Sequence, residues 1–432
     1  MRARLTFAPF LLLLLAAVVS ISGWLSGRDL SYGEALAIYQ DQSGSSTRLI
    51  TLSAYALFIV CSGYVVVRML GRNTISNKRI LVYFLTYFMA TIMVPFIFSE
   101  NHYFNFGYLF SLVAVLAVLQ ARKVDRRLFY FWARVALGAM IFSSLLGAIL
   151  APDKSIAADY YGLAGWIPFR LYGIGMGATG LGVVSVAFLI FEFGDRRWSF
   201  LKISRMVMAI AALVLCQSKT AWIVSVYLLI SYFLIGQMMS LKLSPARVGR
   251  ARVMLFGGYF FVATILLVVL AQGLLSVGSF EGAESIEALT GRLYIWDVTL
   301  QVWLDFPIFG YGLGLWADEW FRNVYGGFNH GHNQLVHTLG AAGIVGLVGL
   351  VLYLVALFRA AVRVADETDV PLNLYVLLVT TALTDVPFLN NSVTDVFFIL
   401  HLLVLMSIIG VRPSANLAYD HLNKNYSVRG SS

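Results

Sequence analysis

Three of the six histidines in the chain lie close together in the segment NHGHNQLVHTLG. The side chains of His330, His332 and His337 have an ordinary pKa of about 6.5, so they can exchange protons near neutral pH. A neutral imidazole at such a place can orient or deprotonate an attacking hydroxyl group. Alternatively, His332 and Asn333 only cap the helix that follows. The crowding of histidines beside a glycine turn supports the two interpretations about equally.

Among these histidines we expect His332 to matter most, His337 less and His330 least. His332 stands where a polar loop meets an apolar helix, and activity should fall as the pH drops through its ordinary pKa. His337 is about one and a third helical turns further on and should pack against neighbouring helices. His330 precedes Gly331 in a segment that is free to move. A metal site is not favoured, because HxHxxxxH has neither the HExxH pattern nor an adjacent carboxylate.

Three basic residues lie near apolar stretches on what we predict to be the outer side of a membrane. Arg170 lies in PFRLYG, Lys219 in CQSKTAW and Arg292 in TGRLYIW. Arginine suits bidentate contact with phosphate, and lysine supplies a point charge. Together the three would suit a lipid-linked diphosphate. Singly, each could bind a phospholipid headgroup or pair with an acid such as Asp297.

Most of the chain that must position these residues is apolar. Of its 432 residues, 59% are hydrophobic and only 12% are charged, whereas about a quarter are charged in a soluble domain. The net charge of +9 does not indicate nucleic acid, because the basic residues form short clusters between apolar stretches, as topology signals do. Cys61 and Cys216 lie inside apolar stretches and predict neither disulfides nor a metal site. We therefore predict an all-α polytopic membrane protein.

The apolar stretches are sufficient for about twelve membrane-spanning helices of about 20 residues each. Most of the 31 basic residues fall on one side of these spans, which places both termini in the cytoplasm. The first apolar stretch lacks a small-residue cleavage site, so we expect it to be a retained span. The predicted division is spans one to nine in residues 1–277, a periplasmic loop at 278–333, spans ten to twelve at 334–411, and a cytoplasmic tail at 412–432.

The long loop before the tenth span is expected to hold a helix along the membrane surface. Apolar residues recur at helical spacing in GRLYIWDVTLQVWL, and Pro307 should end this helix. Gly310, Gly312 and Gly314 then predict a flexible turn. The sixth and tenth predicted spans, near 172–193 and 334–358, contain further glycines that indicate close helix packing. The eleventh span is expected near 371–389.

The order of these motifs resembles the O-antigen ligase and polysaccharide polymerase family of bacterial envelope proteins. The matching elements are FRLYG with Arg170, SKT with Lys219, TGRxxIW with Arg292 and Trp296, DFPIFGYGLG, and GHNQLVHTLGAAGIVG with His332 and Asn333. With the many spans and the late outer loop, the resemblance covers most of the chain. Lys219 stands where the ligases usually have Arg, so the motifs look closest to exopolysaccharide polymerases of the succinoglycan type.

This resemblance implies a glycosyltransferase of the bacterial inner membrane. Its donor would be a polyprenyl-diphosphate-linked glycan on the periplasmic side, used without nucleotide sugar or metal. Carried over by position, Arg170 and Arg292 would engage the diphosphate, and His332 would assist the acceptor hydroxyl. Lys219, Asn333 and Trp296 are then expected to contact the substrate. The implied partners are the donor, a glycan or lipid-linked acceptor, membrane lipids and other polysaccharide export proteins.

Polymerase activity is the function that the motifs favour. A polymerase would transfer a growing glycan to the non-reducing end of another lipid-linked repeat unit. An O-antigen ligase, which delivers the glycan to lipid A core, would use the same chemistry. A secondary transporter or flippase is the alternative of a different class, but paired broken helices are not visible in the two halves. Asp385, near Pro387 in the eleventh predicted span, is the main feature in favour of a transporter.

Overall fold

The computed structural model describes most of the chain. The described residues are 7–26, 28–30, 45–70, 78–120, 126–158, 167–195, 197–241, 243–276, 284–325, 330–389 and 395–409. Residues 1–6, the beginning of the predicted periplasmic loop, its segment 326–329 and the predicted tail at 412–432 lie outside them.

Helices make up about 80% of the structure, which confirms the all-α prediction. The first half contains α1 (Phe7–Leu25), α3 (Ser45–Leu70), α4 (Lys78–Phe88), the π-helical turn η1 (Met89–Met93), α5 (Val94–Phe98), α6 (Gly107–Gln120), α7 (Arg126–Leu150), α8 (Pro152–Ser155), α9 (Ala178–Gly194) and α10 (Phe200–Leu215). The second half contains α11 (Lys219–Ser240), α12 (Pro245–Ser276), α13 (Glu284–Asp305), the 3₁₀ turn η2 (Leu315–Ala317), α14 (Glu319–Tyr325), α15 (Gln334–Arg363), α16 (Val370–Thr384) and α17 (Val396–Ile409).

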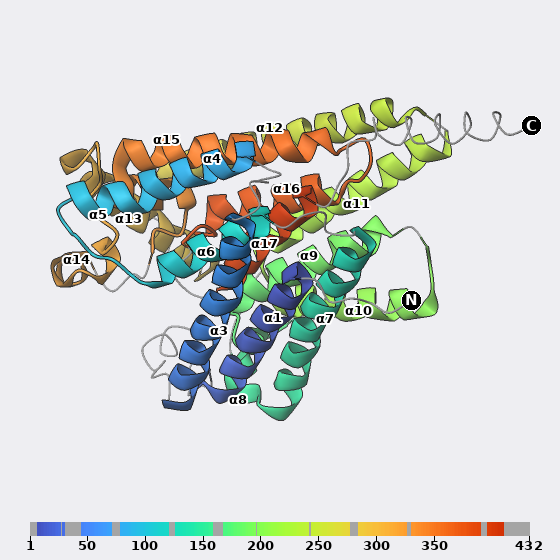
Figure 1. Cartoon of the computed structure of the whole chain (residues 1–432), viewed down its shortest axis with the longest axis horizontal. Helices are drawn as coiled ribbons and strands as arrows, with labels where there is room; N and C mark the ends of the chain where they lie inside the picture. Colours follow the sequence, from blue (N-terminus) through green and yellow to red (C-terminus); the bar gives the residue numbers. More distant parts are fainter. Residues whose placement is uncertain are drawn as a thin grey trace, which may run out of the picture.

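The helices form two connected groups. Figure 1 shows α15 and α4 side by side along one side of the molecule, and α1, α3 and α7 together on the other. Between these groups lie α9, α16 and α17, which contact one another. All residues of α9 from 178 to 192 except Thr179 are buried, and nearly all of α17 is buried as well. A helix that is apolar all round belongs in an interior, and both helices contribute many residues to the main hydrophobic core.

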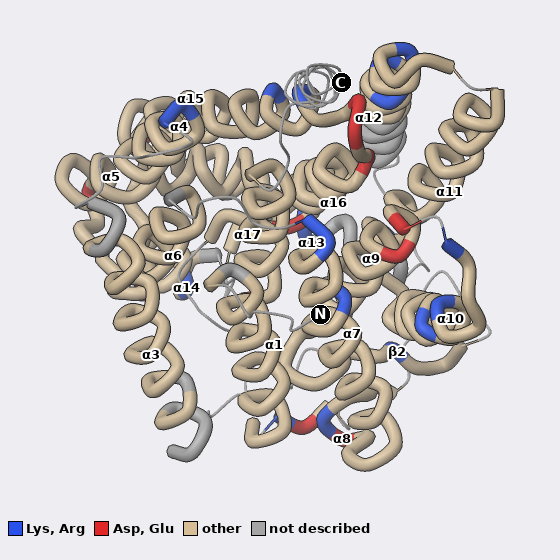
Figure 2. Tube along the Cα trace, turned by 45° about the vertical axis from the view of Figure 1, so that its right-hand side comes forward, with Lys and Arg blue, Asp and Glu red and all other residues tan. Residues whose placement is uncertain are grey.

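The outer helices expose apolar side chains. On α11, for example, Ile223, Val226, Leu229 and Phe233 are exposed. A soluble monomer rarely exposes contiguous apolar patches of more than a few hundred Å², so these side chains fit a lipid environment. Charged residues lie mainly near the helix ends (Figure 2). The chain is therefore a polytopic membrane protein.

Each of the twelve predicted spans overlaps a helix in the described structure. Among the described residues, four helical segments are individually long and apolar enough to cross a membrane: Lys78–Phe98, Arg126–Leu150, Lys219–Ser240 and Gln334–Arg363. Six other apolar helices within these residues are shorter. The number of crossings and the side on which the termini lie remain predictions.

Two predicted spans have different limits in the structure. The sixth was expected from 172, but α9 begins at Ala178. Gly173, Gly175 and Gly177 have φ angles of 64°, 77° and 73°, a backbone region that glycine adopts without steric cost, so this segment turns instead of continuing the helix. The eleventh was expected to reach 389, but α16 ends at Thr384.

One short sheet lies in the predicted outer segment before α9. Strands β1 (Ile156–Ala158) and β2 (Phe169–Leu171) pair antiparallel, with Ala157 opposite Arg170. The sheet fixes the backbone that carries Arg170. The periodicity of the sequence did not predict this sheet.

The helix predicted in the long loop is α13, and it ends at Asp305, two residues before Pro307, as expected. Its buried residues Val298 and Val302 pack with Leu315, Trp316 and Phe321 in a second, smaller core. The helix also packs against α15. Its position along a membrane surface remains a prediction.

The tenth predicted span is interrupted. Gly343, inside α15, has φ 59° and ψ −159°. Beyond the break, the N–H groups of Ile344 and Val345 donate to the carbonyl oxygens of Pro307 and Ile308, at 2.9 and 3.2 Å. The Tyr311 N–H donates to the Gly340 carbonyl at 2.9 Å. The segment after α13 is thus bonded into the break in α15.

The glycine-rich turn after Pro307 is packed, which corrects the expectation of a flexible turn. Gly310 and Gly312 have φ angles of 71° and 125°. A Cβ at Gly310 would lie 2.5 Å from the Ala341 carbonyl carbon, and one at Gly312 would lie 2.2 Å from the Asn101 oxygen. These glycines let two backbone segments approach closely and so fix α13 relative to α15.

Gly343→Ala is expected to destabilise the protein. A Cβ there would lie 2.3 Å from the Ile308 oxygen, and a non-glycine residue in such a backbone conformation costs roughly 1–3 kcal/mol. The apparent melting temperature of the purified protein in detergent should fall by several degrees. Gly236→Ala, at an open position on α11, is the matched control and should leave it unchanged or raised. Equal melting temperatures for both variants would contradict this account of the break.

Candidate active site

His332 lies at the start of α15 in an uncommon backbone conformation. Its φ is 47°, a region that non-glycine residues visit rarely, although Asn, Asp and His are enriched there. Asn333 is the N-cap of α15, and its side-chain oxygen accepts hydrogen bonds from the Leu335 and Val336 N–H groups at 2.9 and 3.2 Å. The capping role considered for Asn333 is therefore present.

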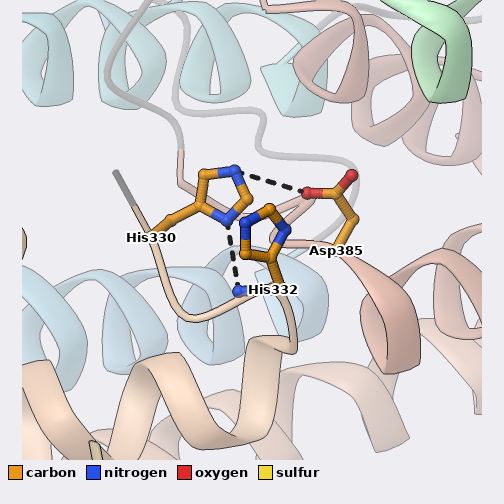
Figure 3. A group of neighbouring side chains, drawn as sticks. All are labelled: His330, His332 and Asp385. Atoms are coloured by element: carbon orange, nitrogen blue, oxygen red, sulfur yellow. Dashed lines mark hydrogen bonds and ion pairs between the residues drawn. The ribbon is translucent and has the colours of Figure 1, made fainter. Parts of the chain in front are cut away.

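His330, His332 and Asp385 form a cluster in front of α15 (Figure 3). The backbone N–H of His332 donates to Nδ1 of His330 at 3.2 Å, and the two rings lie 4.1 Å apart between centroids. Nε2 of His330 lies 3.9 Å from Oδ1 of Asp385. Since Nδ1 of His330 accepts a hydrogen bond, we assign its proton to Nε2, which faces the carboxylate. His330 is thus held by one hydrogen bond at Nδ1, and its Nε2 faces the carboxylate.

His332 differs from His330 in having a ring nitrogen that is free to interact. Its Nδ1 is buried and has no hydrogen-bond partner within the described residues. Buried polar atoms are nearly always paired in folded proteins, and each exception requires a reason. A hydroxyl group of a bound molecule could supply the missing donor.

The carboxyl end of α16 holds several site residues together. The last carbonyl groups of a helix have no partner within the helix. Here the Leu383 carbonyl accepts from Nδ2 of Asn333 at 3.0 Å, and the Thr384 carbonyl accepts from a guanidinium nitrogen of Arg292 at 3.1 Å. Asp385 follows directly and faces His330. Three consecutive residues therefore connect α13, α15 and α16 at one point.

Lys219 and Arg170 are brought together by the turn between α10 and α11. Arg170, on β2, donates from Nε to the Cys216 carbonyl at 3.0 Å. Gln217 donates from Nε2 to the Phe169 carbonyl at 2.8 Å. Lys219 begins α11 after this turn. The charges of Arg292 and Arg170 both act on its ammonium group, so the three predicted cations share one region.

A cleft of about 270 Å³ opens beside the cluster. Its lining includes Arg170, His330, Asp385 and Asp395, together with the glycine-rich segment before α9. The glycines at 175 and 177 with positive φ form part of its wall. The cleft therefore brings one of the predicted cations and two acids into contact with the same space.

Burial controls the protonation of this cluster. Burial, together with smaller effects of nearby His330 and Arg292, lowers the pKa of His332 to about 3. Burial also lowers the pKa of His330, although Asp385 opposes this shift. Both imidazoles are therefore neutral at physiological pH. The expectation that His332 titrates near pH 6.5 is wrong for the free site, because it assumed an imidazole in contact with water.

Asp395 has the opposite shift. Burial, with a smaller effect of the negative charge of Asp385, raises its pKa to about 7. A hydrogen bond from the Phe397 N–H to Oδ1 of Asp395, at 2.9 Å, partly opposes the shift. Asp395 therefore changes its charge in the physiological pH range.

The other residues singled out in the sequence lie nearby with different surroundings. His337 is buried and stacks on Trp316, with ring centroids 4.0 Å apart and an angle of 9° between the planes. Its Nδ1 accepts from the Gly331 N–H at 3.4 Å. This matches the expectation that His337 packs. Trp296 is half-buried, and its Nε1 has no partner among the described residues.

Sequence reasoning missed Asp385 and Asp395 as site residues and described His330 as free to move. No carboxylate is adjacent to the histidines in the sequence, but in the folded chain the carboxylate of Asp385 lies beside His330. A signal for Asp385 was present, because an ionisable residue within a membrane segment is a functional candidate by default. Asp385 was instead weighed only as support for a transporter.

Residues 204–351 match the model of a family described as O-antigen ligase. The matched part runs from α10 into α15 and includes Lys219, Arg292, Trp296, His332 and Asn333. Arg170, Asp385 and Asp395 lie outside it. No curated protein matches the chain.

Proposed function

We propose that this protein is a polysaccharide polymerase, because residues 204–351 match the model of a family described as O-antigen ligase, whose members are glycan-transferring enzymes. Its donor is a glycan linked to a polyprenyl diphosphate, and its acceptor is a hydroxyl group of another lipid-linked repeat unit. The reaction takes place on the periplasmic face of the inner membrane. The observation that carries this proposal is the grouping of Arg170, Lys219 and Arg292 beside a histidine with an unpartnered, buried nitrogen.

The cations serve the donor in this proposal. The bond between the sugar C1 and the phosphate oxygen breaks as the acceptor oxygen bonds to C1, and the departing diphosphate gains negative charge. Fixed positive groups aimed at such developing charge lower the barrier. Arg292 has one nitrogen bonded to the Thr384 carbonyl, which fixes its guanidinium group in place before the donor arrives.

His332 serves the acceptor. With a pKa of about 3 in the free site, the imidazole is a weak base, and it accepts a hydrogen bond from the attacking hydroxyl group through Nδ1. A bound diphosphate offsets the effect of Arg292, and a nearby negative charge favours protonated histidine. Donor binding therefore raises the basicity of His332. The hydroxyl proton passes to His332 as the new bond forms and is then given to the diphosphate or to water.

We propose that this chemistry needs no metal, although His330, His332 and Asp385 have ligand atoms within 4.8 Å of one another. The charges of Arg292 and Lys219 disfavour a divalent cation at this place and favour an anion. We expect turnover to be unchanged after treatment with EDTA. Loss of turnover that one divalent metal restores would show that the cluster is a metal site.

The pH dependence of donor binding should follow Asp395. Below pH 7 this carboxyl group is mostly neutral, and above pH 7 it is mostly ionised, which adds a negative charge to a cleft that receives a diphosphate. Such a repulsion, on the order of 1 kcal/mol, should raise the apparent KM for the donor roughly fivefold between pH 6 and pH 8.

Asp395→Asn should remove this rise, and Asp297→Asn, at an exposed site on α13, should preserve it. A rise of equal size in both variants would assign the titration to another group.

The ligase remains the second candidate because it uses the same chemistry. The glycan profile of a deletion strain separates the two functions. Loss of polymer with accumulation of single repeat units supports the polymerase, whereas uncapped lipid A core indicates the ligase. Asp385 no longer favours a transporter, since its proximity to His330 gives it a place in the site.

A further inference from the structure

A second cleft lies at the far end of α15 from the histidines. Its volume is about 410 Å³. It lies between the beginning of α4 and the end of α15, two helices that pack along each other. The 30 residues of α15 would span roughly 45 Å as a straight helix. This cleft is therefore separate from the candidate active site.

Four cations line this cleft. Lys78 and Arg79 come from α4, and Arg359 and Arg363 come from α15; all four side chains are exposed. The rest of the lining is apolar or aromatic, and it contains no acid. Four positive charges around one space repel one another unless an anion lies among them.

Some other cations of the protein pair with acids. Arg126 pairs with Glu367 at 2.6 Å, and Arg205 pairs with Glu192 at 2.8 Å. In the described part of the chain, no acid lies within ion-pair distance of the four cations in the cleft. A topology signal requires only that cations lie on one side of the membrane. It does not explain why four of them should border one cleft without acids.

The position of Lys78 and Arg79 is also unfavourable for the helix itself. Both lie in the first turn of α4, and cations near a helix N-terminus oppose the helix dipole, whereas those at the end of α15 match it. An anion between the two helix ends would be attracted by all four side chains. The placement of Lys78 and Arg79 is thus better explained by a ligand than by helix stability.

Exposed apolar side chains continue from the cleft along both helices. Val82 and Leu85 follow Lys78 and Arg79 at helical spacing on α4, and Val355 and Leu352 precede Arg359 on α15. Residues three and four apart share a helix face. A molecule with a charged head and apolar chains would therefore meet cations at the cleft and apolar surface beyond it.

We propose that this cleft binds the phosphate-bearing headgroup of an anionic membrane lipid, with the acyl chains along the exposed faces of α4 and α15. Basic pockets between membrane helices bind such headgroups. The proposal does not depend on the proposed transferase activity.

Native mass spectrometry of the delipidated full-length protein tests this proposal. The probes are phosphatidylglycerol, phosphatidylcholine and inorganic phosphate. We expect phosphatidylglycerol to bind in preference to phosphatidylcholine, and millimolar inorganic phosphate to leave it bound. In the double variant Arg359→Gln/Arg363→Gln, its affinity should fall at least tenfold, since each cation near a membrane surface contributes about fivefold.

The matched control is Arg247→Gln/Arg250→Gln, which removes two exposed cations from α12 outside the cleft. This variant should bind phosphatidylglycerol as the wild type does. Equal losses in both double variants would show general electrostatic attraction and overturn the proposal. Displacement of phosphatidylglycerol by inorganic phosphate would overturn the proposal that a lipid occupies the cleft. The double variant Lys78→Gln/Arg79→Gln removes the two cations that α4 contributes to the cleft. It should show the same loss of phosphatidylglycerol affinity, so the proposal can be tested even if Arg359→Gln/Arg363→Gln folds poorly.

Discussion

Arg292→Ala is expected to lower turnover about 10²–10³-fold, the size found when one donor to a developing negative charge is removed. Arg292 is anchored to the Thr384 carbonyl and its charge acts on Lys219, His330 and His332. Arg292→Lys should retain more activity than Arg292→Ala, because lysine keeps the charge but loses the planar fork. The measurement is the rate of glycan transfer from a lipid-linked donor by purified, folded variants.

Arg322→Ala is the control for this prediction. Arg322 is an exposed cation on α14, and its Nε donates to the Trp316 carbonyl at 3.2 Å. It lies outside the cluster, so its removal should change turnover less than about threefold, as surface substitutions usually have small effects. Equal losses of turnover for Arg292→Ala and Arg322→Ala would indicate that Arg292 has a general electrostatic role and no specific contact with the diphosphate.

Replacement of His332 should cost about 10²-fold or more in turnover, within the range for a positioned acid or base. Two variants are useful because His332 has φ 47°. His332→Gln keeps hydrogen-bonding capacity without the ring, and His332→Asn places a residue that tolerates this backbone region. Loss of activity in the Asn variant is therefore not explained by backbone strain.

His337→Gln is the control for the histidine assignment. It removes the stack on Trp316, so it should lower the melting temperature while a folded fraction keeps its turnover. His330→Gln should have an intermediate effect, because His330 accepts the His332 N–H and faces Asp385. This revises the expectation that His330 matters least. An active His332→Asn enzyme beside an inactive, folded His337→Gln enzyme would contradict the assignment.

Local features of the site could be predicted from the sequence. Asn333 before an apolar helix indicated a cap, and Pro307 indicated the end of α13. The structure contains both features. They could be predicted because each depends only on residues that are close together in the chain. The apolar stretches likewise predicted the helices, because burial in lipid or in a helical interior requires that composition. Arg170, Lys219 and Arg292 were grouped because all three are predicted to lie on the outer side of the membrane.

Contacts between distant segments could not be predicted in the same way. Asp385 reaches His330 only because α16 ends at Thr384, where the sequence pattern continues as an apolar stretch. Gly343 indicated helix packing, yet it breaks α15, because the Pro307 and Ile308 carbonyls accept the N–H groups of the next turn. The pKa values of His332 and Asp395 depend on burial, which no local pattern reveals.

The most direct measurement supplies the purified full-length protein with a polyprenyl-diphosphate-linked repeat unit and no nucleotide sugar, metal or lipid A core. We expect a ladder of longer glycans still attached to lipid diphosphate, with one polyprenyl diphosphate released for each bond formed. His332→Asn should abolish both the ladder and the release. Consumption of donor only after lipid A core is added, or movement of donor across a vesicle without bond formation, would contradict the polymerase account.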